Sequence, residues 1–207
     1  MAGLREKQKA DREKRILQAA VTRFRADGYR SVRIEDLAEA AEVSVGTVYN
    51  YYTTKGDILI ATVAMEVEEV LEEGAALVAA PPHGAEKALL ALIFGYYDHS
   101  LNYLSKEMWR RAMALSIEAP STPNGRRYAE LDRRLEAQVA EMIGVLQARG
   151  EVRGDVDPEP LGRVVFDTLN QAFIGFVSDE AMTLTTLRSN VRATIRTLAH
   201  LISTEAA

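Results

Sequence analysis

The sequence predicts an all-α protein with a small N-terminal head and a larger C-terminal helical bundle. Apolar residues recur at helical spacing in nearly every segment of the 207-residue chain, and no segment alternates convincingly as a strand would. Proline and glycine interrupt this pattern at residues 81–84 and again at 120–125, which we expect to be loops. Because 47% of the residues are apolar, the chain can bury a sizeable core. We therefore predict about nine helices.

The helices of the head follow from a stripe of apolar residues and from helix-end signals. Ile16, Ala20 and Phe24 form a stripe at four-residue spacing, and Gly28 can adopt the left-handed conformation that ends a helix. A short second helix precedes a third, for which Ser44 is the expected N-cap. The nine expected helices cover residues 10–26, 34–41, 45–51, 55–78, 86–101, 106–117, 127–149, 158–177 and 185–202.

The later helices have similarly clear start and end signals. Gly150 ends the seventh helix, and Asp157-Pro158-Glu159 supplies an N-cap carboxylate, a proline in the first turn and an acidic residue for the eighth. The ninth helix has an apolar side and an arginine side. The apolar side comprises Leu187, Val191, Ile195, Leu198 and Ile202, and the arginine side comprises Arg188, Arg192 and Arg196.

Composition favours a folded protein of the cytoplasm. The chain contains no cysteine, which excludes disulfides and thiolate metal sites. Its first ten residues are polar and charged, unlike a signal peptide, and no apolar run approaches the roughly 18 residues of a membrane span. We expect no membrane association.

The net charge of −5 is unevenly distributed along the chain. Residues 1–57 contain eleven basic and nine acidic residues, whereas the remainder contains fourteen and twenty-one. Six of the basic residues lie within the first fifteen, against three acidic ones. A basic arm on an acidic chain is typical of a nucleic-acid-binding head, although a solvated helix start explains the same pattern.

The third helix has an outer face that is unlike a buried one. At about 100° per residue, Val45, Val48 and Tyr52 point toward the core, while Gly46 and Asn50 lie on the opposite face. Small, hydroxyl, amide and aromatic groups on an outer face suit a helix that lies in the major groove of DNA. A three-helix bundle without a ligand is the alternative.

We expect the outer groups of this helix to divide between base contacts and phosphate contacts. Thr47 and Asn50 can reach base edges or phosphates, and Val45 could touch a thymine methyl. Tyr49 and Tyr51 can donate to phosphate oxygens, which positions a protein without reading the sequence.

Residues 10–59 resemble the DNA-binding domain of TetR-type transcriptional regulators. The matching features are Gly28-Tyr29, the run Ile34–Ala38, the run Val43–Tyr52, Lys55 and Leu59. The resemblance implies a helix-turn-helix head over residues 1–55, followed by a ligand-sensing and dimerisation domain over 56–207. With Lys55 as an expected phosphate contact, the candidate DNA-binding residues are Arg33, Ser44, Val45, Gly46, Thr47, Tyr49, Asn50, Tyr51 and Lys55.

Two residues depart from the family pattern. Glu42 occupies a turn position where the family often has glycine, and a positive φ there would strain a glutamate. Tyr52 stands where phenylalanine is more usual, so its hydroxyl needs a hydrogen-bond partner or access to water.

The C-terminal region contains no diagnostic motif. By resemblance, the last two helices form a homodimer interface, although ordinary core packing explains their apolar residues nearly as well. Asn170 lies among apolar neighbours, where its amide could bond to a ligand, a partner subunit or a nearby helix. The residues that could line an apolar ligand pocket, each of which could equally be plain core, are Met65, Phe94, Tyr97, Trp109, Met113, Asn170 and Phe173.

No arrangement of residues points to catalysis, a metal or a cofactor. Asp98, His99 and Ser100 are adjacent on a helix and point about 100° apart, so they cannot form a hydrolytic relay. The acidic residues of the fourth helix, Glu66 among them, are expected to form a solvated face. The resemblance to TetR-type regulators implies a dimeric repressor that binds a palindromic double-stranded DNA operator and is released by a small apolar effector. The alternative is a helical protein-binding adaptor with a vestigial head.

Overall fold

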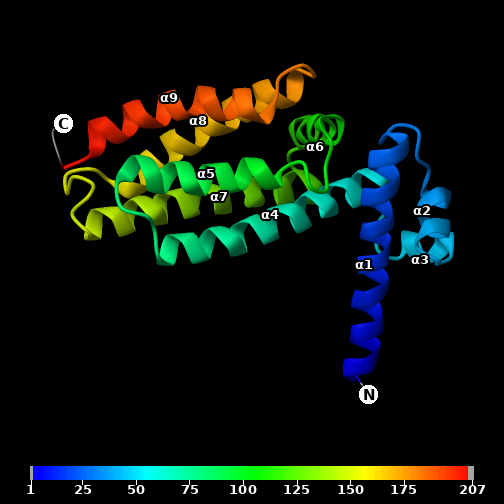
Figure 1. The fold of residues 1–207 in the computed structure, drawn as a ribbon. Coiled ribbons are helices and arrows are strands. Elements are labelled where there is room, and N and C mark those ends of the chain that lie inside the picture. The colour runs from blue at the N-terminus through cyan, green and yellow to red at the C-terminus, as the bar shows by residue number, and fades with distance from the viewer. Residues whose placement is uncertain (1, 205–207) are drawn as a thin grey trace. The chain divides into compact units, whose positions relative to one another are not determined.

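The computed structural model consists of α-helices joined by short turns (Figure 1). It describes residues 2–204, and it describes only the backbone of residues 2 and 4. Every named element within these residues is an α-helix, which confirms the all-α prediction. The nine helices are α1 (Ala2–Asp27), α2 (Ile34–Ala40), α3 (Val45–Tyr49), α4 (Lys55–Ala79), α5 (Ala85–His99), α6 (Lys106–Glu118), α7 (Pro123–Ala148), α8 (Pro158–Ser178) and α9 (Leu184–Ile202).

Two helices begin earlier than the sequence analysis predicted. Helix α1 begins at Ala2 rather than near residue 10, because the charged segment before the apolar stripe consists mainly of strong helix formers. Helix α7 begins at Pro123 rather than near residue 127, so the prediction of a loop over residues 123–125 was wrong. There, Thr122 Oγ1 accepts a hydrogen bond from the Gly125 amide at 3.2 Å, and proline fits the first turn of a helix.

The chain divides into two compact units. The first contains the chain up to Met65 together with Tyr103–Tyr128, and the second contains Glu66–Asn102 together with the chain from Ala129 onward. This division differs from the predicted boundary after residue 55, because helix α6 and the start of α7 belong to the same unit as the head. Helix α4 contributes residues to both units.

The core of the first unit contains the predicted apolar stripe of α1. Ile16 and Ala20 are fully buried, and Phe24 is 1% exposed. Leu37 of α2 and Val48 of α3 are also fully buried. Burial of these side chains supplies most of the free energy that holds three short helices together, since isolated helices of this length are marginal in water.

In the second unit, α9 packs against α5 and α8. Its buried face includes Leu187, Val191 and Ile195, as predicted, but Ala199 takes the buried position next to Ile202. Leu198, which was expected on this face, is only half-buried. Asp157 caps α8 as predicted, by accepting a hydrogen bond from the Glu159 amide at 3.2 Å.

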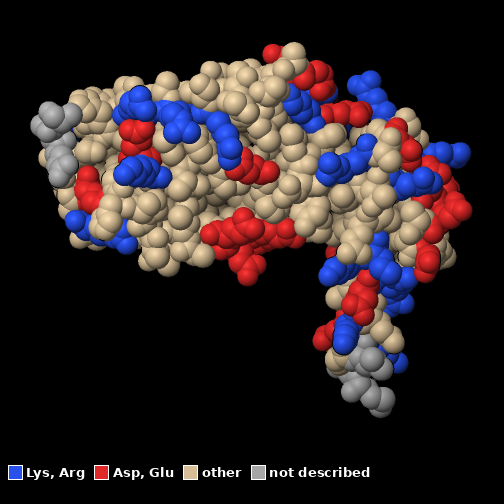
Figure 2. All heavy atoms as spheres, in the orientation of Figure 1, with Lys and Arg blue, Asp and Glu red and all other residues tan. Residues whose placement is uncertain are grey.

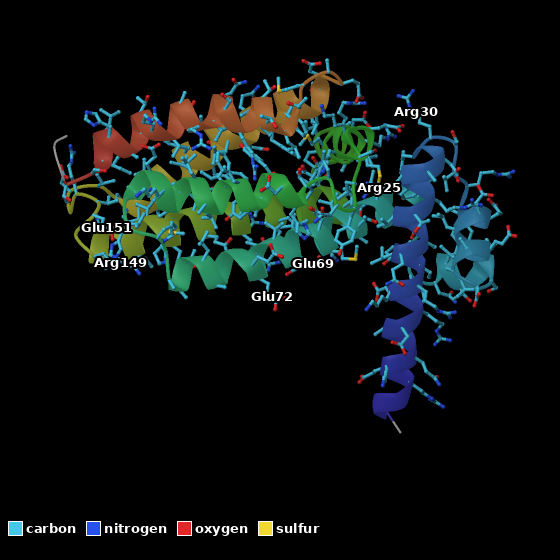
Figure 3. The ribbon with its side chains drawn as sticks, viewed as in Figure 1. Arg25, Arg30, Glu69, Glu72, Arg149 and Glu151 are labelled. Atoms are coloured by element: carbon cyan, nitrogen blue, oxygen red, sulfur yellow. The ribbon has the colours of Figure 1, made fainter. Side chains whose placement is uncertain are left out.

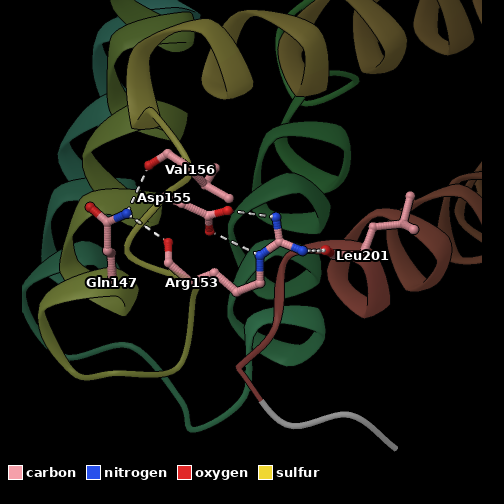
Figure 4. A network of polar contacts seen from close by, with 5 residues as sticks. All are labelled: Gln147, Arg153, Asp155, Val156 and Leu201. Atoms are coloured by element: carbon pink, nitrogen blue, oxygen red, sulfur yellow. Dashed lines mark hydrogen bonds and ion pairs between the residues drawn. The ribbon is translucent and has the colours of Figure 1, made fainter.

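The connection between α7 and α8 is fastened to the end of α9 (Figure 4). The Gln147 side-chain amide donates to the carbonyl oxygens of Arg153 and Val156, both at 2.8 Å. The Arg153 guanidinium pairs with Asp155 and also donates to the Leu201 carbonyl at 3.3 Å. These bonds fix the C-terminal end of α9 beside the start of α8.

The predicted acidic face of α4 is solvated except at Glu66. Glu72 is exposed and Glu69 is half-buried (Figure 3), whereas Glu66 is only 1% exposed. His99 Nδ1 lies 2.8 Å from Glu66 Oε1, and its Nε2 lies 3.5 Å from Glu69 Oε2. The prediction was wrong for Glu66, since a buried carboxylate is tolerated here by its pairing with the histidine.

Within residues 2–204, none of the helices combines the length and apolar character that crossing a membrane requires.

Candidate nucleic-acid interface

The turn between α2 and α3 is built on a left-handed residue. Glu42 has a φ of +53°, which confirms the suspected strain at this position. Its amide donates to the Glu39 carbonyl, and the amide of Val43 donates to the Ala38 carbonyl, each at 3.0 Å. This pair of bonds is a Schellman motif, which normally has glycine at the left-handed position. The turn therefore has the geometry that glycine would favour, although a glutamate occupies it.

Helix α3 begins at its predicted N-cap. The Thr47 amide donates to Ser44 Oγ at 3.1 Å, and the two hydroxyl oxygens lie 2.8 Å apart. Val48 is fully buried and Tyr52 is 7% exposed, so both point inward as the sequence predicted. Val45 is half-buried. These contacts fix the rotation of α3 about its own axis.

The outward face of α3 is open to solvent. Gly46 and Asn50 are exposed, and the Tyr49 side chain is 51% exposed. Among the described residues, the Tyr49 hydroxyl and the Asn50 side-chain amide form no hydrogen bond. Thr47 is half-buried, and its hydroxyl faces Ser44. A compact set of polar groups is therefore available to a ligand on this face.

The Tyr51 hydroxyl has a partner within the protein. It donates to the Lys9 carbonyl of α1 at 3.0 Å. Tyr51 therefore ties the turn after α3 to α1 instead of pointing freely outward. The Tyr52 hydroxyl donates to Glu13 Oε1 at 3.2 Å, which supplies the partner that this residue was expected to need. Burial and the nearby Glu13 carboxylate raise the pKa of Tyr52. Lys9 lies in the part of α1 that precedes the predicted helix, whereas Glu13 lies within the predicted helix.

Lys55 at the start of α4 is bound to the backbone of the head. Its ammonium donates to the carbonyl oxygens of Tyr29 at 2.7 Å, Arg30 at 3.2 Å and Val32 at 2.8 Å. It also lies 4.5 Å from the centre of the Tyr29 ring. Since an ammonium has three donors, this arrangement uses all of them and differs from the expected phosphate contact. Burial, with the neighbouring Arg111, lowers the pKa of Lys55.

Arg33, the other phosphate candidate, stands exposed at the N-cap of α2. Its amide donates to Asp36 Oδ2 at 2.7 Å, and its guanidinium Nε lies 3.6 Å from Glu35 Oε2. An exposed ion pair of this kind is worth little, so the guanidinium is free to turn toward an anion.

Two residues that the sequence analysis did not single out also belong to this unit. Burial raises the pKa of Tyr29, and the positive charge of Arg111 of α6 opposes this rise. Asn124 of α7 donates to Asp57 Oδ1 at 2.5 Å. The Asp57 carboxylate in turn accepts from the Thr54 amide at 2.8 Å. The start of α4 is therefore held by a residue of α7, which no local pattern could reveal.

The predicted pocket residues divide between the two units. Met65, Trp109 and Met113 belong to the first unit, and the others belong to the second. Within the second unit, the rings of Tyr97 and Phe173 stack with centroids 5.9 Å apart, and the Tyr97 hydroxyl donates to the Leu169 carbonyl.

The remaining two pocket candidates, Phe94 and Asn170, are half-buried. The guanidiniums of Arg188 and Arg192 lie 5.1 and 5.3 Å from the centre of the Phe94 ring. A single pocket lined by all seven residues remains a prediction.

The strained turn gives a direct test. Replacing Glu42 by glycine should raise the free energy of unfolding by roughly 0.5–1 kcal/mol, because the left-handed strain exceeds the entropy that glycine adds to the unfolded chain. The ion pair that is lost, 3.9 Å long and 88% exposed at Glu42, contributes little. Glu39→Gly within α2 is the control, and urea denaturation should show it to be destabilising. A loss of stability in Glu42→Gly would contradict the strain.

Comparison with known proteins supports the interpretation of the head. The family model for "Bacterial regulatory proteins, tetR family" matches residues 16–62. The transcriptional repressor KstR of Rhodococcus jostii is 38% identical over 64 residues, and KstR of Mycolicibacterium smegmatis is 37% identical over 60 residues. These matches span 31% and 29% of this chain, and 30% and 29% of the two repressors.

Similarity to solved structures extends over nearly the whole chain. A TetR-family regulator from Mesorhizobium loti superposes with a TM-score of 0.74 at 21% identity, covering 94% of this chain and 98% of that one. FadR of Thermus thermophilus, solved in complex with lauroyl-CoA, gives a TM-score of 0.67 at 23% identity, with 94% and 97% covered. Residues 16–62 therefore match the family model of the tetR regulators, and the chain has the fold of the solved TetR-family structures.

Proposed function

We propose that this protein is a one-component transcriptional repressor that binds duplex DNA through α3. The exposed polar face of α3 is the observation that supports this proposal best, because the N-cap and the buried Val48 hold that face in one orientation. An exposed helix of this shape fits a major groove. The KstR relatives are repressors, and their similarity lies in the segment that contains α3.

The groups on α3 suit different kinds of contact. The free amide of Asn50 and the hydroxyl of Thr47 can hydrogen-bond to base edges, and Gly46 allows close approach to the groove. Tyr49 and Arg33 can donate to phosphates, which sets the position of the head without reading sequence. Tyr51 and Lys55 support this surface from behind, since their donors bond to the protein backbone.

We further propose that the protein acts as a homodimer through α8 and α9. Large apolar side chains are exposed on both helices: Val164 is 52% exposed, Ile174 37% and Leu201 60%. Exposed apolar side chains of this size are typical of a surface that a partner covers, and Ala193 of α9 is exposed as well. A two-fold dimer would read a palindromic operator whose half-sites lie about 34–36 Å apart.

The effector is proposed to be a small apolar molecule. Two structurally similar proteins were solved with small molecules: the TetR-family repressor FadR with lauroyl-CoA, and a transcriptional regulator from Saccharomonospora viridis with choline. Helix α4 offers a route for release, since it begins at Lys55 in the head and continues into the second unit. A ligand that shifted α4 would move the carbonyl contacts of Lys55 and with them the head.

Selection from random duplexes tests the DNA-binding proposal. We expect the purified protein to enrich a palindrome at low salt. Asn50→Ala and Thr47→Ala should each relax the preference at one base position, by about 1–3 kcal/mol per good base contact. Thr22→Ala, an exposed hydroxyl of α1 bonded only within its own helix, is the control. If no sequence is enriched and a protein partner is captured instead, the adaptor alternative is correct.

Sedimentation equilibrium tests the dimer. The wild type should sediment as a dimer at micromolar concentration, and Val164→Asp combined with Ile174→Asp should shift it to monomer, because two charges would be buried unpaired. Ile117→Asp is the matched control, since Ile117 is 78% exposed on α6. A wild-type monomer would refute dimerisation without affecting the interpretation of α3.

A further inference from the structure

The first turns of α1 form a charged helix whose side chains take no part in the DNA contacts proposed above. We call residues 2–15 the arm; it contains six basic and three acidic residues. Residues 5–15 are exposed apart from Glu13, which is half-buried. Figure 2 shows basic side chains gathered on this half of α1. Because the arm is helical from Ala2, its charges have fixed directions, unlike those of a flexible tail.

The arm is attached to the end of the recognition helix. The Tyr51 hydroxyl donates to the Lys9 carbonyl at 3.0 Å, and the Tyr52 hydroxyl donates to Glu13 Oε1 at 3.2 Å. Lys9 and Glu13 are one helical turn apart, so the two tyrosines that follow α3 hold adjacent turns of the arm. Any duplex that lies against α3 is therefore close to the arm.

One side of the arm is basic and free. At about 100° per residue, Arg5, Lys9 and Arg12 lie within about 60° of one another, on the side of α1 that continues the buried stripe of Ile16 and Ala20. Beyond the head that side is exposed. Within residues 2–204, Arg5, Lys9 and Arg12 form no ion pair. The packing side of α1 thus becomes a basic side where the head ends.

We propose that Arg5, Lys9 and Arg12 bind backbone phosphates that flank the base pairs read by α3. This inference rests on the proposed DNA-binding function and adds a second contact element to it. Arg5 and Arg12 are seven residues apart, about 10 Å along the helix, which spans about three base-pair steps of one strand. Charge complementarity selects the duplex backbone as the partner. These contacts add affinity and salt dependence but no sequence preference.

A pair of matched double variants tests the proposal. Arg5→Ala/Arg12→Ala removes two charges from the basic side, and Lys7→Ala/Lys14→Ala removes two charges, also seven residues apart, from the opposite side. Alanine is a strong helix former, so far-UV circular dichroism should confirm that both variants keep the arm helical. Affinity for the selected operator is measured by fluorescence anisotropy between 50 and 200 mM salt, with flanking DNA included.

Because both protomers of the proposed dimer carry the arm, the arginine pair removes four charges from the operator complex. It should lower the slope of log affinity against log salt by about 3.6 units, whereas the lysine pair should change it by less than half as much. Between 50 and 200 mM salt, the wild type should accordingly lose about 150-fold more affinity than the arginine variant. Hydroxyl-radical footprints should lose protection only at the flanks. Equal effects of the two pairs, or no effect of either, would overturn the arm contact while the selected operator still bound. Failure of the wild type to bind any duplex would refute the proposed function itself.

Discussion

The ammonium of Lys55 is the contact on which the geometry of the head depends. Lys55 is the first residue of α4, and its ammonium donates to three carbonyl oxygens of the segment that connects α1 to α2. Tyr29, whose ring lies beneath the ammonium, also packs edge-on against the buried Phe24 of α1. One cation thus joins the end of α1, the approach to α2 and the beginning of α4. Without it, three carbonyls in a half-buried turn would lack their charged donor, and such groups are expensive to leave unsatisfied.

The direction of α3 depends on a second constraint, the left-handed Glu42. The Schellman bonds of Glu42 and Val43 end α2, and the hydroxyl of Ser44 begins α3 two residues after Glu42. So short a connection leaves little freedom in the angle between the helices. A strained residue is retained at the turn that orients the binding surface, which is where backbone strain commonly has a functional reason. Lys55 therefore holds the helices of the head together, and Glu42 sets the direction of α3.

Local sequence patterns were sufficient to predict most of the fold. Apolar spacing and helix-end signals placed nine helices, and the family pattern singled out Glu42 as a residue with a positive φ. Apolar periodicity does not predict the early start of α1, because helix propensity alone extends α1 through a polar segment.

Contacts between distant residues could not be predicted in this way. Nothing near Lys55 in the sequence shows that its ammonium reaches carbonyls more than twenty residues earlier, and nothing near Glu66 shows that His99 lies beside it. The same limit applied to Tyr51, whose partner belongs to a turn of α1 that was not expected to be helical. Lysine and tyrosine side chains can take several roles. Tertiary contacts, and not the immediate sequence neighbours, decide which role each one takes.

Amide hydrogen exchange of Lys55→Met in the full chain tests whether the Lys55 ammonium holds the helices of the head in place. Methionine keeps the length of the side chain but removes the three donors. We expect amides of α2 and α3 to exchange at least about tenfold faster, which corresponds to a loss of about 1.4 kcal/mol in local stability, while buried amides of α7 such as Met142 and Ile143 are unchanged. Unchanged protection in α2 and α3 would show that the head keeps its geometry without the Lys55 ammonium.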